Sequence, residues 1–259
     1  MVWEIAAAGM TRAAGNVNGD AVGVNGWVAS GRAPAAWAWG HPAAGAEAFA
    51  VADGIQPGYG ALGAQLVAAR ASKADLVRDS ETVAATLAAA HAELTGESYF
   101  ADHWDVQPDR LRLPGTTVAG CRVEPADASL LIFNVGDSGV FLVDGAHLGK
   151  QSIDDRLGTG LLTQAVGGGP PGDPAPHIVK VKLGSKNRVL LCSDGLTDML
   201  PHPELERLVA RPPTAERAVE ALMRLCHQLD TGDDVTALVL DVDWAENRPR
   251  SRFRGWGGS

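Results

Sequence analysis

Aspartates stand directly beside several apolar, strand-like runs of this sequence. Asp53 follows the run FAVA, Asp194 follows VLLCS, and Asp137 follows IFNVG. Asp233 stands on the other side of such a run, just before VTALVL. Carboxylates that converge from several strand ends are costly to bury and raise one another's pKa, unless a cation lies among them. Hard oxygen ligands favour Mg²⁺, Mn²⁺ or Ca²⁺ over zinc, so these aspartates predict a metal centre.

A turn is the alternative interpretation of each Asp-Gly pair. Asp144-Gly145 lies between FLV and HL and is typical of a hairpin turn. Taken singly, Asp53-Gly54 and Asp194-Gly195 would also indicate a turn more often than a ligand. Each of these two pairs follows a long apolar run, and together the pairs favour the metal centre.

The elements that must position these aspartates alternate between strand-like and helix-like patterns. Strands are predicted at 48–53, 116–123, 129–135, 139–143, 177–182, 187–193 and 234–242. Helices are predicted at 60–77, at 81–95 after a Ser80 cap and before Gly96, and at 214–229 after a Thr214 cap. Loops are expected at 31–47, 97–114 and 167–176. Hairpin-like runs with helices between them indicate an α+β fold of antiparallel sheets, in one domain covering 1–244.

The composition and charge of the chain argue against several functional classes of protein. The 259 residues carry a formal charge of −9, which argues against nonspecific binding of nucleic acid. Three well-separated cysteines, no basic leader segment and no long apolar run argue against a secreted or membrane protein, so we expect a cytoplasmic one. Segment 245–259 holds four arginines and one glutamate, which predicts a basic, disordered tail with a charge of +3. A docking segment for an acidic partner is the alternative for this tail.

An ordered series of motifs resembles one family. The sequence reads VADG at 51–54, GTT at 115–117, NVGDS at 134–138, LTQAVGG at 162–168, LLCSDGLTD at 190–198 and GDDVT at 232–236. This series resembles the metal-dependent serine/threonine protein phosphatases of the 2C type, the PPM family, over about residues 3–243. The resemblance implies a four-layer α-β-β-α sandwich of two antiparallel sheets flanked by helices, in a bacterial signalling enzyme.

The resemblance also implies roles for individual residues. Asp53 resembles the carboxylate that bridges two metal ions, and Gly54 resembles the residue whose carbonyl binds one of them. Asp194 and Asp233 resemble the remaining ligands of the first ion, and Asp20 resembles the acid that holds metal-bound water. Two Mn²⁺ or Mg²⁺ ions would then activate a water that attacks the phosphorus of phosphoserine or phosphothreonine.

A weaker third ion is implied at two further positions, which are Asp137 and Asp198. No protein nucleophile is required by this chemistry. The seven histidines show no ligand spacing, and we expect packing or surface roles for them.

Four positions depart from the family pattern. Gly15 stands where an arginine usually binds the substrate phosphate, and Arg12 is the candidate substitute. Gly19 replaces a glutamate, Gly58 replaces a histidine that serves as a candidate general acid, and Asp234 replaces an asparagine.

A fifth difference is a deletion. The family commonly inserts a flap of some thirty residues before LTQAVGG, whereas Ser152 to Leu161 leaves room only for a short turn. Loss of the flap predicts a more open cleft.

The sequence thus predicts a monomeric phosphatase that acts on a phosphoprotein substrate of a serine/threonine kinase. The lost arginine and histidine motivate an alternative, a pseudophosphatase that binds phosphoproteins with weak or no turnover. A third candidate is a regulatory phosphatase acting on an anti-sigma antagonist, although no sensor domain accompanies it in this sequence.

Overall fold

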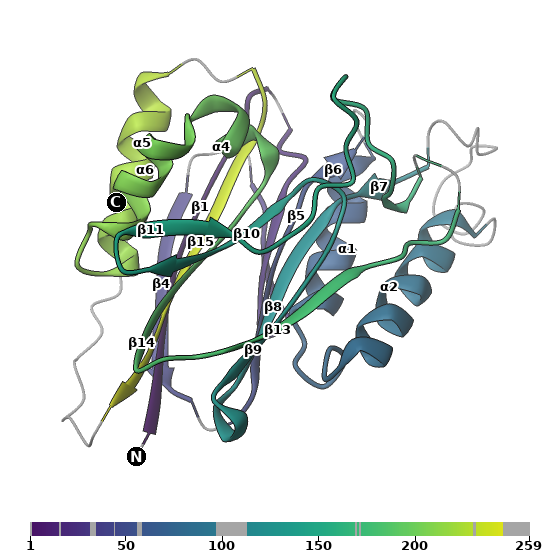
Figure 1. The fold of residues 1–259 in the computed structure, drawn as a ribbon. Helices are drawn as coiled ribbons and strands as arrows, with labels where there is room; N and C mark the ends of the chain where they lie inside the picture. Colours follow the sequence, from purple (N-terminus) through teal and green to yellow (C-terminus); the bar gives the residue numbers. More distant parts are fainter. Residues whose placement is uncertain are drawn as a thin grey trace.

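Two antiparallel sheets lie face to face, and helices cover the outer face of each (Figure 1). The structure is a computed structural model that describes residues 2–15, 17–31, 35–43, 45–55, 59–96, 113–168, 170, 172–229 and 232–245. The predicted α-β-β-α sandwich is confirmed. Most of the predicted basic tail, from residue 246 onward, lies outside the described residues.

The first sheet has the strand order β11-β10-β14-β15-β1-β4. Its two longest strands, β1 and β15, pair along their full length, from Val2 opposite Ala245 to Arg12 opposite Val235. In sequence order, the strands of this sheet are β1 (Val2–Arg12), β4 (Ala35–Pro42), β10 (Gly139–Asp144), β11 (His147–Lys150), β14 (Lys186–Cys192) and β15 (Val235–Ala245).

The second sheet has the order β13-β9-β8-β5-β2-β3. Its strands are β2 (Ala21–Val24), β3 (Trp27–Ala29), β5 (Glu47–Ala52), β8 (Val118–Glu124), β9 (Ser129–Val135) and β13 (His177–Lys182). A small third sheet at one end of the sandwich joins three two-residue strands, which are β6 (Gly54–Ile55), β7 (Gly115–Thr116) and β12 (Val166–Gly167).

Helices α1 (Gly60–Ala71) and α2 (Ser80–Thr95) cover the second sheet. Helix α2 begins with a capping box in which Asp79 and Thr82 each bind the other's backbone N–H. Helices α4 (Asp194–Met199), α5 (His202–Ala210) and α6 (Ala215–Gln228) cover the first sheet. Within the described residues, no helix is both long and apolar enough to span a bilayer.

Alternating side chains of each strand fill three apolar layers. One layer lies between the sheets and contains Phe49, Ile132 and Leu238. A second packs the first sheet against α5 and α6, and a third packs the second sheet against α1 and α2. Period-two strands thus bury both faces, which leaves their ends as the places where polar groups can gather.

Several boundaries differ from the sequence predictions. Strand β4 runs through the segment 31–47 that was predicted as a loop, and the short helices α4 and α5 were not predicted. The first helix ends at Ala71 rather than residue 77, and Asp79 rather than Ser80 caps the second. The Thr214 cap of α6 is confirmed by its hydrogen bond from the Arg217 N–H.

Candidate metal centre

Carboxylates from both sheets meet at one end of the sandwich. Strands β14 and β15 are antiparallel neighbours, so Asp194 just after β14 and Asp233 just before β15 lie at the same end of the two strands. The second sheet repeats this arrangement, because Ala21 of β2 pairs with Ala52 of β5. Asp20, just before β2, therefore lies at the same strand end as Asp53, which directly follows β5. Four of the aspartates predicted from the sequence are brought together in this way.

A buried hydrogen-bond network ties Asp20 to the first sheet. The Ser193 hydroxyl donates to Asp20 Oδ2 at 2.8 Å and accepts from the Thr236 N–H at 3.0 Å. The Asp20 N–H donates to the Asn18 side-chain carbonyl at 2.8 Å, and the Asn18 amide donates to the Thr11 hydroxyl. These contacts fix the Asp20 carboxylate between the sheets.

The GTT motif holds the Asp53 backbone. The Asp53 carbonyl accepts from the Thr116 hydroxyl and from the Thr117 N–H, both at 2.8 Å. The Thr117 hydroxyl also lies 2.6 Å from the Ser138 hydroxyl, beside Asp137. The two threonines of this motif therefore fix the Asp53 backbone by hydrogen bonds, and the sequence alone does not indicate this role.

Burial and mutual repulsion disfavour negative charge here. Burial raises the pKa of Asp20 from an ordinary 3.8 to about 7. Burial, and then the charges of Asp20 and Asp194, hold the pKa of Asp53 well above its usual range. The pKa of Asp233 is raised too, chiefly by burial. The carboxylates are thus close enough to oppose one another's ionisation.

The donor set fits divalent cations. Oδ1 of Asp20 and Oδ1 of Asp194 are buried and have no hydrogen-bond partner. An ionised carboxylate oxygen in that position lacks compensation that a metal ion would provide. In the described part of the chain, no three acidic, histidine or cysteine side chains form a ready-made cluster around one point.

Gly54 and Gly19 allow a close backbone approach beside Asp53. A Cβ added to Gly54 would lie 2.5 Å from the Gly19 carbonyl, and one added to Gly19 would lie 3.2 Å from the Gly54 carbonyl. Asp234 fixes this approach, because Oδ2 accepts from the Gly19 N–H at 2.5 Å and Oδ1 from the Ala14 N–H at 2.6 Å. The position where the family has asparagine thus acts here as an acceptor that shapes the N-terminal loop.

Asp137 and Asp198, the two positions implied for a third ion, meet at Arg156. The Arg156 guanidinium binds both oxygens of Asp198, at 2.8 Å and 3.2 Å. Its Nη1 also lies 3.5 Å from Asp194 Oδ2 and 3.6 Å from Asp137 Oδ2. Burial raises the pKa of Asp137 to about 6, against the opposing effect of Arg156.

Arg12, the candidate phosphate ligand, ends β1 opposite Val235. Val235 packs in the layer between the first sheet and its helices. Burial raises the pKa of Cys226 on α6 to about 11, and the charge of Arg12 opposes this increase. The register thus assigns Arg12 to the helix-covered face, and its role at the site stays a prediction. Gly15 is described, whereas Gly58 lies outside the described residues.

The residues that the sequence interpretation missed are polar groups that orient the aspartates. Ser193 and Thr236 lie within the quoted motifs, one residue before Asp194 and two residues after Asp234, and this proximity was an available signal. Arg156 had none, because nothing local relates it to carboxylates some twenty to forty residues away in sequence.

Comparison with known proteins gives matches along most of the chain. Residues 47–243 match the family model described as Stage II sporulation protein E (SpoIIE). A curated relative, the serine/threonine phosphatase stp of Listeria monocytogenes serotype 4b, is 26% identical over an alignment of 150 residues, and the match covers 50% of this chain. The match spans 57% of that relative's length.

Solved structures share the fold. The S. agalactiae serine/threonine phosphatase has a TM-score of 0.71 at 15% identity, covering 91% of this chain and 98% of its own. The PPM Ser-Thr phosphatase MsPP from Mycobacterium smegmatis, in complex with cacodylate, has a TM-score of 0.65 at 21% identity, covering 92% and 98%. The catalytic domain of PstP, in complex with two manganese ions, has a TM-score of 0.64 at 23% identity, covering 93% and 99%.

Proposed function

This chain belongs to the family of Stage II sporulation protein E (SpoIIE), and from that premise we propose that it is a metal-dependent phosphatase of phosphoserine and phosphothreonine in proteins. The resemblance to the 2C-type phosphatases predicted from the ordered motifs is confirmed. The activity, the substrate and the two-ion site are proposals for this chain, because its match covers little more than half of the curated relative.

One observation carries the proposal. Two buried carboxylate oxygens, one from Asp20 beside the second sheet and one from Asp194 beside the first, have no hydrogen-bond partner at the end where both sheets deliver aspartates. Such an arrangement is destabilising in a protein with no bound cation, because the buried negative charge is not compensated, and this supports a cation-binding site. A relative of the same fold holds two manganese ions, which supports the same number here.

Each aspartate has a proposed task. Asp53, Asp194 and Asp233, with the Gly54 carbonyl, would hold two Mn²⁺ or Mg²⁺ ions, which supply an activated water and offset charge on the phosphoryl group. Asp20 keeps one oxygen bound to the Ser193 hydroxyl and the other free, so it can accept a hydrogen bond from that water and orient it.

The substrate phosphate needs a positively charged ligand at the site. Arg12 remains the candidate ligand, and reaching the site would require its side chain to leave the helix-covered face. The short turn after Ser152, closed by hydrogen bonds of Leu157 with Leu161 and Gly160, stands where the family carries its flap. We therefore propose an open cleft and a phosphoprotein substrate produced by a serine/threonine kinase.

Hydrolysis of p-nitrophenyl phosphate and of a phosphothreonine peptide tests the proposal. Activity should require Mn²⁺ and disappear with EDTA. The Asp194→Ala variant should lose more activity than the roughly 10–100-fold typical of losing a residue that only supports a ligand. The control is Asp144→Ala, which removes an equally charged side chain from an exposed hairpin turn.

The outcomes separate the candidates. Hydrolysis that survives both EDTA and Asp194→Ala would exclude the two-metal mechanism. Mn²⁺ binding without turnover, on peptides as well as on the small ester, would instead identify a phosphoprotein-binding pseudophosphatase. Rates that fall equally in Asp144→Ala and Asp194→Ala would show only a general loss of folded protein.

A further inference from the structure

The guanidinium of Arg156 lies among three carboxylates at the edge of the candidate metal centre. It contacts Asp198 through two nitrogens and reaches Asp194 and Asp137 through one of them, at 3.5 Å and 3.6 Å. Asp137 is only 6% exposed, whereas the Arg156 side chain is 30% exposed. The guanidinium therefore lies in an acidic corner formed by Asp137, Asp194 and Asp198. This corner is buried on the side of Asp137 and exposed to solvent on the side of Arg156 and Asp198.

The backbone around Arg156 is built to hold it there. Its neighbour Asp155 is buried and accepts hydrogen bonds from the Gly136 N–H at 2.9 Å and from the Gln164 amide at 2.8 Å. The His177 ring nitrogen lies 2.8 Å from the same carboxylate. Because Gly136 precedes Asp137, these bonds fasten the short turn directly to the strand end that carries one of the three carboxylates.

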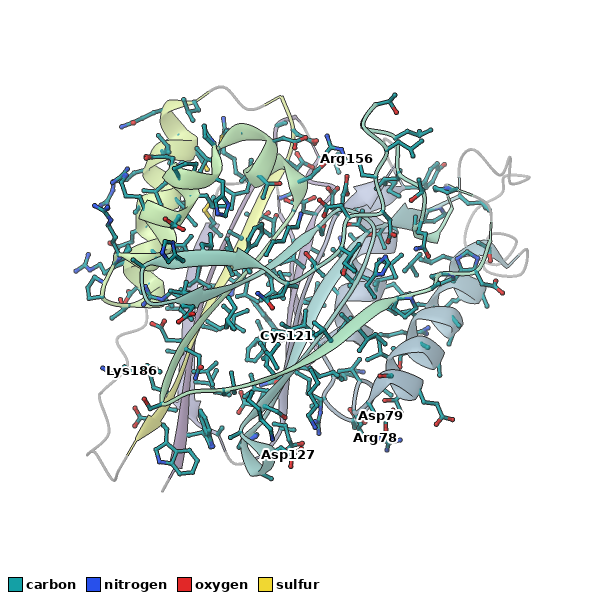
Figure 2. All side chains as sticks on the ribbon, in the orientation of Figure 1. Arg78, Asp79, Cys121, Asp127, Arg156 and Lys186 are labelled. Carbon is teal, nitrogen blue, oxygen red and sulfur yellow. The ribbon has the colours of Figure 1, made fainter. Side chains whose placement is uncertain are left out.

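The turn itself adds a second constraint. Arg156 forms an isolated β-bridge with Leu162, and Gly160 between them adopts a positive φ of 85° that closes the turn. Figure 2 shows Arg156 at the end of the sandwich opposite Asp127. Deletion of the flap thus leaves a short, fixed connection whose first side chain points at the aspartates.

A guanidinium and a metal ion cannot share this corner. Both would need the same oxygens of Asp137 and Asp198, and the charge of arginine persists at all relevant pH values. A divalent ion arriving there would have to break the two-pronged pair with Asp198 and would be repelled by the displaced cation.

We propose that Arg156 is the built-in cation of this corner, so that the site takes two divalent ions and none between Asp137 and Asp198. The inference rests on the proposed two-ion site and replaces the third ion expected from the sequence. Arg156 acts as a positioning residue, which holds Asp194 from one side while leaving Oδ1 of Asp194 available.

The test counts bound ions rather than activity. Mn²⁺ binding is measured by calorimetry and by the electron paramagnetic resonance signal of free Mn²⁺, on wild type, Arg156→Ala and Arg207→Ala. Arg207 is the matched control, because it makes a similar two-pronged pair with Glu204 on the exposed side of α5. Wild type and Arg207→Ala should bind two ions, and Arg156→Ala should bind a third, weaker one.

The double variant Arg156→Ala/Asp198→Asn should return to two ions, since it lacks a ligand for the third. Arg156→Gln, which keeps a long polar side chain but no charge, should also bind three and covers the case in which the alanine variant does not fold. Three ions in wild type, or two in both Arg156 variants, would overturn the inference. No ion in wild type would instead overturn the proposed function on which it rests.

Discussion

Replacing the buried carboxyl of Asp20 should make the stability of the metal-free protein less dependent on pH. Asp20 is 1% exposed, and burial raises its pKa to about 7. In the Asp20→Asn variant the side-chain carbonyl can still accept from the Ser193 hydroxyl. The new amide group occupies the place of the oxygen that has no partner. The variant thus removes a costly charge and keeps the local shape.

The magnitude follows from the pKa in the two states. The folded protein binds the Asp20 proton more tightly than the unfolded chain, so stability falls as pH rises from 3.8 to about 7. The full loss is about 4 kcal/mol above that range, and most of it occurs between pH 5 and pH 8. Between pH 5 and pH 8, wild type should therefore lose about 3 kcal/mol that the variant does not lose.

Urea unfolding of EDTA-treated protein measures this difference. The stability of Asp20→Asn relative to wild type should rise by about 3 kcal/mol from pH 5 to pH 8. Asp144→Asn, which removes an exposed carboxylate, is the control. Saturating Mn²⁺ should reduce the pH dependence of wild type, because cations then replace protons among the aspartates. An equal difference between variant and wild type at both pH values would refute the reasoning.

Three other substitutions test the framework of the site. Gly195→Ala would place a Cβ 2.0 Å from the Asp234 carbonyl, so it should weaken Mn²⁺ binding and lower the unfolding free energy by about 1–3 kcal/mol, measured by calorimetry and urea titration. Arg188→Ala should cost about 3–5 kcal/mol in urea unfolding, because it leaves the half-buried Asp241 without its 2.6 Å ion pair; a loss below 1 kcal/mol would contradict this. Leu222→Ala should open a cavity between α6 and the first sheet and cost about 2–5 kcal/mol with Mn²⁺ affinity unchanged.

Long, strongly patterned elements were predicted well because local side-chain periodicity reports burial. Helix α2 buries Val83, Leu87, Ala90 and Leu94, whose spacing of i, i+4, i+7 and i+11 in the sequence is that of one helix face. The strands that precede Asp53 and Asp194, β5 and β14, were predicted from their apolar runs. The aspartates at their ends could therefore be named as a group.

Most of the missed elements are short and have too few residues for a period. The eleven-residue strand β1 was also missed, because its run of alanines followed by glycine shows no apolar-polar alternation. Helix α4 has six residues and begins at Asp194, within a segment interpreted as a metal-binding motif. Strand β4 lies among Gly, Pro and Ala residues, and its pairing with β1 supplies the order that its composition does not indicate. In both cases tertiary packing outweighs weak local preference.

The sequence by itself determined the identity and order of the aspartates, because apolar strand-like runs mark Asp53, Asp137, Asp194 and Asp233, and the resemblance of the ordered motifs adds Asp20 and Asp198. Only the tertiary structure decided which groups surround them. Ser193 binds Asp20 across 173 positions of sequence, and Arg156 reaches Asp198 across 42. Such contacts depend on how two sheets pack and on where a shortened turn points, and no local pattern encodes either. The aspartates can thus be identified from the sequence, whereas the position of the Arg156 guanidinium among Asp137, Asp194 and Asp198 is shown only by the tertiary structure.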